Sequence, residues 1–197
     1  MLVGYESNNP LRNSRQHGDF SRELIARIAD RHINGYRAML FTKNVKRAYR
    51  TYFSGNSNVS TYVPTGLSRL LPSLWLRFSL NSIIKTEQVK VKLYHGLNSE
   101  LPYGLDRDIK TVITYYGLSN HNKNSLMDRL FWRTRLHYAF RASNRIIAVD
   151  EKARVELLDA GVPEDKIVVI GVEGHPFEVT DQLADAYYEV YRDLVGD

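Results

Sequence analysis

The chain has 197 residues, no cysteine and a formal net charge of +5. Its hydrophobic fraction of 43% supports a packed core, and its charged fraction of 25% excludes bulk disorder. The absence of cysteine excludes disulfides, thiolate nucleophiles and cysteine-based zinc sites, and it fits a reducing compartment. No apolar run reaches the roughly 18 residues of a membrane span. The N-terminus lacks the basic region and cleavage site of a signal peptide, so we expect a cytoplasmic protein.

Strands and helices alternate through the first half of the sequence. We expect strands over residues 2–6, 36–41 and 59–63. Asp19 is a plausible N-cap for a helix that reaches His32 and stops at Asn34-Gly35. A second apolar stripe at helical spacing, with Pro72 in the first turn of its helix, consists of Leu67, Leu70, Leu71, Leu74, Trp75 and Phe78.

The second half continues this alternation and indicates the fold class. Strands are expected over 89–94, 111–116, 145–149 and 166–172, and a long helix over 126–141. Asp150 is expected to cap a further helix that ends at Gly161. Such an order predicts an α/β protein with a Rossmann-like parallel sheet and helices on both faces.

The last segment is predicted to be a helix that packs back on the sheet. Residues 171–179 are irregular, and Thr180 is expected to cap a helix whose apolar stripe is Leu183, Tyr187, Val190, Tyr191 and Leu194. We therefore divide the chain into a domain over residues 1–178 and a closing helix within residues 179–197.

Several segments resemble bacterial family-4 glycosyltransferases. Residues 94–102, YHGLNSELP, are similar to the family's YHGLSxELP segment, and residues 162–170, VPEDKIVVI, to its IPEEKIxVI. The other similar segments, all in the family's order, are Gly4-Tyr5, 18–22 (GDFSR), 110–114 (KTVIT), Asp128-Arg129 and 144–151 (NRIIAVDE). The resemblance covers roughly residues 1–178 and rests on the order and spacing of the segments rather than on one motif.

The resemblance implies one half of a GT-B fold, in which two Rossmann-like domains face each other across a cleft. In the family the N-terminal domain receives the acceptor, and the C-terminal domain binds the nucleotide-sugar donor through a basic pair and a Glu-x7-Glu motif. This chain resembles the acceptor-side domain joined to the family's crossing helix, with the donor-binding domain absent between Gly174 and Thr180. Glu156 and Glu164 have the motif's spacing but lie in the wrong domain. We expect no cofactor and no metal.

Candidate cleft residues follow from the resemblance, and each also has a purely structural interpretation. They are Arg15, His17 and Gly18 before the first helix, His95, Gly96 and Glu100 at and just after the end of one strand, and Tyr115, Tyr116 and Gly117 at the end of the next. A helix start suits phosphate, but Gly18 also fits as a turn glycine. His95 fits equally as the partner of a neighbouring loop, Glu100 as a solvated carboxylate, and the tyrosines as packing aromatics.

One departure from the family makes catalysis by this domain doubtful. Tyr116 and Gly117 stand where the family's TIHDL segment has histidine and aspartate, and tyrosine, with a pKa of ~10, is a poor base near neutrality. Three functions stay open: the acceptor-side domain of a glycosyltransferase in polysaccharide biosynthesis, inactive alone; a non-catalytic module that binds a glycan or lipid-linked acceptor; and an engineered minimal domain without function.

The expected partners follow from charge and from the family. They are a glycan or lipid-linked acceptor, a separate donor-binding chain, and a second copy through the exposed cleft. A basic run, Lys43, Lys46, Arg47 and Arg50, and a basic helix with Arg69 and Arg77 indicate either peripheral contact with the inner face of a membrane or solvated surfaces. No nucleic-acid-binding motif occurs, so nucleic acid ranks last.

Overall fold

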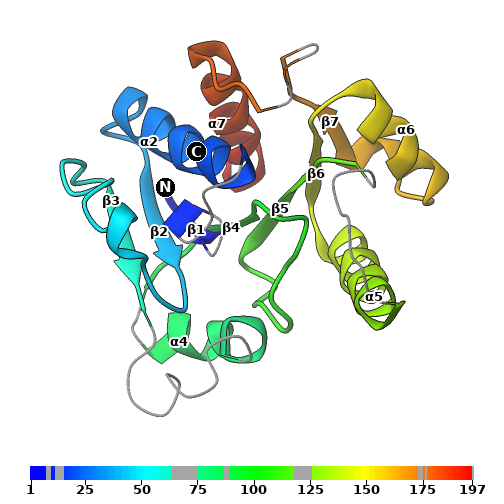
Figure 1. Cartoon of the computed structure of the whole chain (residues 1–197), viewed down its shortest axis with the longest axis horizontal. Helices are drawn as coiled ribbons and strands as arrows, with labels where there is room; N and C mark the ends of the chain where they lie inside the picture. Colours follow the sequence, from blue (N-terminus) through cyan, green and yellow to red (C-terminus); the bar gives the residue numbers. More distant parts are fainter. Residues whose placement is uncertain are drawn as a thin grey trace.

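The computed structural model describes residues 1–7, 10–11, 16–63, 75–86, 89–117, 126–172, 175 and 177–196. Its centre is a seven-stranded sheet in the order β3-β2-β1-β4-β5-β6-β7, and every neighbouring pair is parallel (Figure 1). The strands are β1 (Leu2–Glu6), β2 (Arg37–Phe41), β3 (Val59–Tyr62), β4 (Leu93–Gly96), β5 (Lys110–Tyr115), β6 (Arg145–Ala148) and β7 (Ile167–Val169). The predicted Rossmann-like α/β fold is confirmed.

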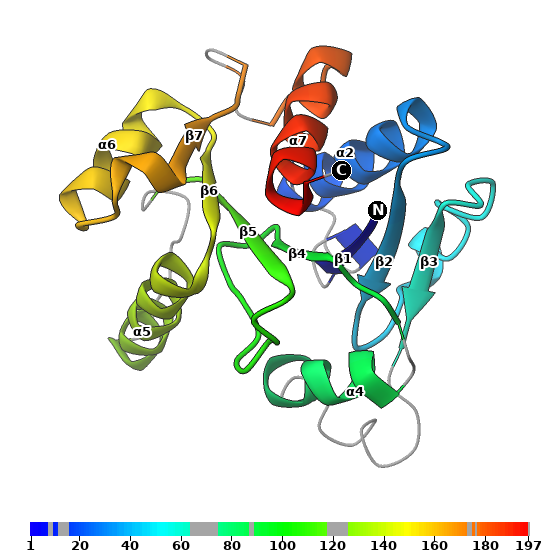
Figure 2. The same cartoon turned by 180° about the vertical axis from the view of Figure 1, so that it is seen from behind.

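Helices cover both faces of this sheet. One face carries α2 (Gln16–Arg31) and α7 (Asp181–Val195), which lie side by side (Figures 1 and 2). The other face carries α4 (Leu80–Thr86), α5 (Leu126–Ala142) and α6 (Glu151–Asp159). The shorter helical segments are a π-helix over Trp75–Ser79 and 3-10 turns at Arg47–Tyr49 and Glu164–Lys166.

The central strands are buried on both faces, as their apolar composition predicts. All four residues of β4 are buried, and Ile146, Ile147 and Ala148 of β6 are fully shielded from solvent. Helices on both faces explain this burial, because parallel strands need crossover connections, and four of the six here contain an α-helix: α2, α4, α5 and α6.

Both predicted helix caps in the second half of the chain are confirmed. The Asp150 carboxylate accepts a hydrogen bond from the Ala153 amide at 2.7 Å, and the Thr180 hydroxyl accepts one from the Leu183 amide at 3.1 Å. Each cap satisfies a backbone amide that lacks a partner inside its helix.

The prediction that Asp19 begins the first helix is wrong. Helix α2 begins at Gln16, so Asp19 lies in its first turn and forms an ion pair with Arg22, one turn further on. The same Arg22 donates a hydrogen bond to the carbonyl of Pro10 at 2.7 Å and lies over the ring of Tyr49. Asp19 therefore holds a buried arginine in place instead of capping the helix.

The predicted bounds of two strands are shifted by more than one residue. Strand β4 begins at Leu93 rather than at residue 89, because Leu93 is the first residue of this segment that pairs with both β1 and β5. Strand β7 is shorter than predicted at both ends: residue 166 still belongs to a 3-10 turn, and the strand ends at Val169 rather than at residue 172. The amide of Ile170 continues the pattern of β7 with one bond to the carbonyl of Ala148 at 2.9 Å.

The predicted stripe around Pro72 lies largely outside the described residues, and its last member is on the surface. Phe78 is 59% exposed and stacks on Tyr103, with ring centroids 5.3 Å apart. The wider π-helical turn at this position changes the periodicity. Leu80 and Ile84 of the following α4 are buried in its place.

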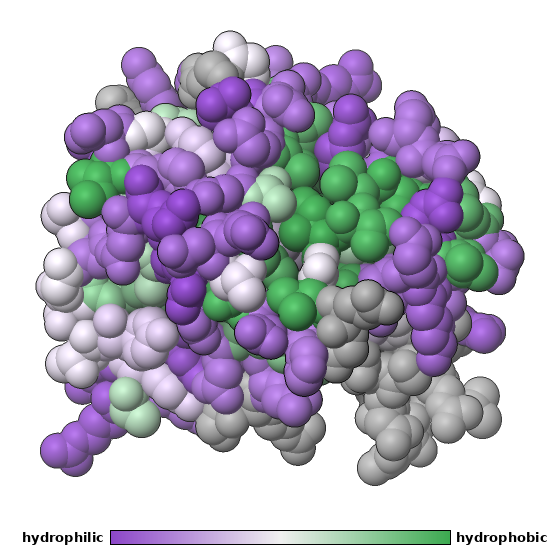
Figure 3. All heavy atoms as spheres, turned by 90° about the horizontal axis from the view of Figure 1, so that it is seen from above, coloured by the Kyte–Doolittle hydropathy of each residue, from purple (hydrophilic) through white to green (hydrophobic). Residues whose placement is uncertain are grey.

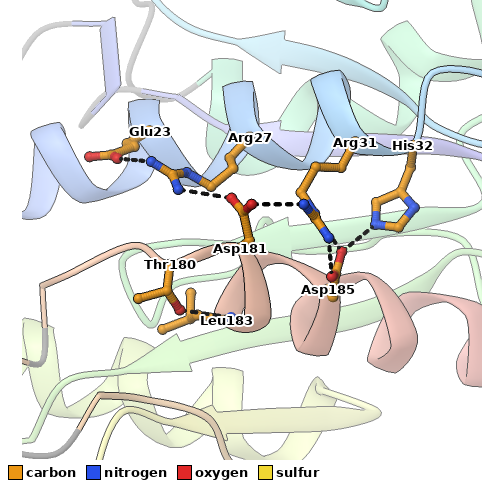
Figure 4. A network of polar contacts seen from close by, with 8 residues as sticks. All are labelled: Glu23, Arg27, Arg31, His32, Thr180, Asp181, Leu183 and Asp185. Atoms are coloured by element: carbon orange, nitrogen blue, oxygen red, sulfur yellow. Dashed lines mark hydrogen bonds and ion pairs between the residues drawn. The ribbon is translucent and has the colours of Figure 1, made fainter.

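Helix α7 is joined to α2 by a surface network of ion pairs (Figure 4). Asp181 accepts hydrogen bonds from Arg27 at 2.9 Å and Arg31 at 2.8 Å. Asp185 accepts from Arg31 at 2.8 and 2.5 Å and contacts His32 at 3.0 Å. The hydrogen bond from Arg31 is the main cause of the lowered pKa of Asp185. Exposed pairs stabilise a protein by only about 0–1 kcal/mol each, so this network chiefly fixes the position of α7 along α2.

A second network, fully buried, joins α7 to three strands. Its bonds connect, in order, the side chains of Tyr36, Tyr5, Tyr191, His95, Thr114 and Tyr187, at 2.7, 3.3, 2.7, 2.9 and 3.4 Å. Two of its six members belong to α7, and the others come from β1, β4, β5 and the residue before β2. Helix α7 therefore shields from solvent the polar side chains on this face of the sheet.

Beyond α7 the same face of the sheet is partly apolar and open. Apolar side chains gather beside α7 on the side away from α2 (Figure 3). The partly buried apolar residues of α7 and of the segment around β7 include Val168, Val172, Ala186, Val190 and Leu194. This surface lies outside the polar network that holds α7.

Candidate functional site

The predicted cleft residues lie at the start of α2, which follows β1, and at or just beyond the carboxyl ends of β4 and β5. These three strands are neighbours in the sheet order. Parallel sheets bind ligands beyond these ends, where loops from adjacent strands meet. Arg15 lies outside the described residues.

The start of α2 meets the end of β5. The ring of His17 packs edge-on against the rings of Tyr116 and Phe177, with centroid distances of 4.6 and 4.7 Å. Gly18, in the first turn of α2, is buried. Tyr116 and Phe177 in turn stack on each other at 5.6 Å. The structure thus brings together two predicted residues, His17 and Tyr116, and adds Phe177.

The loop after β4 folds back over its own strand end, and Gly96 makes this possible. A Cβ atom on Gly96 would lie 2.0 Å from the carbonyl oxygen of Glu100. Ser99 adopts a positive φ of 59° and donates a hydrogen bond to the carbonyl of Thr114 at 2.7 Å. Asn98 donates to the Glu6 carboxylate at 2.9 Å. The loop therefore ties the carboxyl ends of β1, β4 and β5 together.

We predict that Gly96→Ala destabilises the protein by about 3 kcal/mol, because the added methyl overlaps a backbone oxygen and forces the loop to move. The measurement is urea unfolding followed by circular dichroism. Gly55→Ala is the matched control, since nothing lies within 4 Å of a Cβ at Gly55. Equal midpoints for the two variants would contradict the close approach at Gly96.

Glu100 is held by two arginines instead of being freely solvated. Its carboxylate accepts hydrogen bonds from Arg77 at 3.3 Å and from Arg135 at 3.2 Å, and its side chain is 30% exposed. The two arginines come from the π-helical turn and from α5, so Glu100 links these elements across the loop. A role in the cleft stays a prediction.

His95 is closed to solvent, contrary to the expectation that it lines a cleft. It is 0% exposed, and its two ring nitrogens contact the Tyr191 hydroxyl at 2.7 Å and the Thr114 hydroxyl at 2.9 Å. Burial lowers the pKa of His95 to about 3, so the ring is neutral. His95 is buried because α7 covers this position of the sheet. In this arrangement His95 does not reach a substrate.

Tyr115 and Tyr116 point to opposite faces of the sheet, as successive strand residues do. The Tyr115 hydroxyl donates to Glu156 of α6 at 2.9 Å. Tyr116 is 3% exposed and packs on the α2 side. Burial is the main cause of the raised pKa of both phenols. Neither is suited to accept a proton near neutral pH.

Gly117 follows at a φ of +85°, and a Cβ there would lie 3.3 Å from the Glu156 carboxylate. Both constraints favour glycine, which explains why this chain departs from the family's aspartate in structural terms. Within the part of the chain that the structure describes, no three histidine, aspartate or glutamate side chains gather as metal ligands. Over the same residues, no helix is both long and apolar enough to cross a bilayer.

A family model, Glycosyltransferase Family 4, matches residues 20–171. The chain belongs to this family. The match begins within α2, ends just after β7, and includes the loop after β4 and the end of β5. A comparison with curated proteins finds no match.

Solved structures share the fold of this family-4 chain at low identity. The Anabaena protein HepE in complex with UDP-glucose aligns with a TM-score of 0.54 and 13% identity over 86% of this chain and 43% of its own. Staphylococcus aureus MnaA with UDP aligns at 0.53 and 12%, over 92% and 47%. UDP-GlcNAc 2-epimerase from Neisseria meningitidis, bound to UDP-GlcNAc, aligns at 0.51 and 11%, over 98% and 50%. This chain thus spans about half the length of these proteins.

Proposed function

We propose that this family-4 chain is the acceptor-side part of a glycosyltransferase that works in polysaccharide biosynthesis. It would hold a glycan or lipid-linked acceptor while a glycosyl group is transferred from a nucleotide-sugar. The family match over residues 20–171 carries this proposal. The meeting of His17, the loop after β4 and the end of β5 at one edge of the sheet supports the place of binding.

We further propose that the donor is bound by protein outside these 197 residues, on another polypeptide or on a longer form of this one. The titratable strand-end residues of the predicted cleft, His95, Tyr115 and Tyr116, are all buried, so they do not supply an accessible base. The exposed side chains of Lys46, Arg47 and Arg50 support a position at the cytoplasmic face of an anionic membrane.

The first experiment is calorimetric titration of the chain with UDP- and GDP-sugars. We expect no saturable binding to the chain alone, and sugar transfer to a glycan or lipid-linked acceptor once a donor-binding half from a family-4 enzyme is added. Clear binding to the chain alone would refute the separate donor half. Absence of transfer with every donor half and acceptor tried would count against a role in transfer.

The burial of His95 and Tyr116 also favours a second candidate, a module that binds an acceptor without chemistry. A glycan and lipid panel separates the two functions. Binding on the panel without transfer in the reconstituted reaction would support the module. Binding together with transfer would support the glycosyltransferase.

A further inference from the structure

A cavity of about 530 Å³ lies between α5 and α6, on the face of the sheet opposite α7. Its volume falls within the roughly 300–1,000 Å³ of small-molecule sites. The cavity is distinct from the cluster of His17, Tyr116 and Phe177, because Tyr115, not Tyr116, points toward it. It opens to solvent between the two helices.

The walls of the cavity are largely apolar. Leu136 and Phe140, one turn apart on α5, are both buried, and the ring of Phe140 packs edge-on against Tyr115 at 5.5 Å. Ala160, just after α6, lines the opposite side and is exposed. An alkyl chain or an aromatic ring placed here would lose part of its contact with water.

The polar groups of the cavity differ in charge between its two helices. On α6 the Glu156 carboxylate accepts the hydrogen bond of the Tyr115 hydroxyl and repels a second anion. On α5 the exposed side chains of Arg133 and His137 lie one turn apart on the same helix face as Leu136 and Phe140. An anionic group therefore fits on the α5 side, where arginine is a strong partner for phosphate or carboxylate.

We propose that this cavity binds an amphiphilic anion. Its apolar part lies against Leu136, Phe140 and Ala160, and its phosphate or carboxylate is bound by Arg133 and His137. The proposal does not depend on glycosyl transfer, since it rests on the cavity alone. The same chemistry occurs in a soluble alkyl phosphate and in the headgroup and first carbons of an anionic lipid.

The test begins with calorimetric titration of the whole chain with butyl, hexyl and octyl phosphate. Affinity is expected to rise about fourfold for each added methylene until the cavity is filled. Inorganic phosphate alone, and the octyl glucoside that lacks a charge, should bind much more weakly. An affinity that does not depend on chain length, or no saturable binding of octyl phosphate, would overturn the proposal.

Three variants test whether the ligand binds in the cavity. Ala160→Phe fills the cavity from an exposed position, so the core stays intact, and it should weaken octyl phosphate binding at least tenfold. Arg133→Gln should weaken it about tenfold through loss of a charge-assisted hydrogen bond. Lys152→Gln on the exposed surface of α6 is the matched charge control and should leave binding unchanged. Native affinity in Ala160→Phe, with an unchanged circular dichroism spectrum, would also overturn the site.

Sedimentation with vesicles that contain phosphatidic acid separates the two sources of the ligand. Vesicle binding that Ala160→Phe abolishes identifies a lipid headgroup as the source. Binding of octyl phosphate without binding to vesicles identifies a soluble amphiphile. Failure of the donor-half experiment leaves both readouts unaffected, so the two proposals fail separately.

Discussion

Removal of residues 180–197 is expected to abolish cooperative folding of this chain. Helix α7 contributes four buried side chains to the core, Leu183, Ala184, Tyr187 and Tyr191. Loss of a single buried aromatic side chain costs about 3–5 kcal/mol, and the whole stability of a domain is about 5–15 kcal/mol. Two tyrosines and a leucine together approach that total, and the deletion also leaves Tyr5 and His95 without partners on α7.

Size-exclusion chromatography, near-ultraviolet circular dichroism and binding of a hydrophobic dye measure this outcome. The truncated chain should aggregate and bind the dye. A chain that ends at Val195 is the control, because it keeps all of α7 and should behave as the native protein does. A soluble truncation at Val179 with native stability would refute the packing of α7.

Helix α7 was predictable because its signals are local. The Thr180 cap and a stripe with a spacing of three and four residues both lie within the helix itself. The cap formed by Asp150 on α6 is local in the same way, so it too is predictable from the sequence. The prediction for Asp19 is wrong because acidic residues are favoured in the first turn of a helix as well as at its N-cap. Its partner, Arg22, is held by a hydrogen bond to the Pro10 carbonyl, a contact that the helix pattern does not show.

The partners of α7 were not predictable from sequence. The Tyr191 hydroxyl meets Tyr5 and His95 because β1 and β4 are in a register that places these two side by side. Periodicity predicts that a strand residue alternates between faces, but it does not say which face a distant helix covers. His95 could therefore be placed at a strand end but not on the face beneath α7.

Gly96 and Gly117 show a second limit of what can be predicted from the sequence. A glycine at or just after a strand end indicates a turn; Gly96 is the last residue of β4, and Gly117 lies two residues beyond β5. The reasons for them, however, are contacts with the Glu100 carbonyl and the Glu156 carboxylate, which depend on the tertiary structure. Phe177, which joins His17 and Tyr116, had no signal at all because it lies in an irregular segment.

Acidification is expected to destabilise the protein through His95. Its pKa falls from 6.5 to about 3 on folding, because burial excludes the charged ring. Below pH 6.5 the unfolded chain therefore binds a proton that the folded chain does not, and stability falls as the pH falls. At about 1.4 kcal/mol per pH unit, the loss reaches about 2 kcal/mol at pH 5 and about 5 kcal/mol near pH 3, where it levels off.

Urea unfolding at pH 7, 6, 5 and 4 tests this dependence in the native protein and in His95→Gln. The amide of glutamine both donates and accepts hydrogen bonds but does not titrate, so the variant should lose less stability than the native protein over this range. Asp185, whose pKa Arg31 lowers, also destabilises the fold in acid, but it does so in both proteins and cancels in the difference. The difference in unfolding free energy between the two proteins should change with pH at a slope that corresponds to nearly one bound proton per molecule between pH 6 and 4. Parallel curves would mean that the ring is protonated inside the folded protein, and α7 would then have to open to admit the proton.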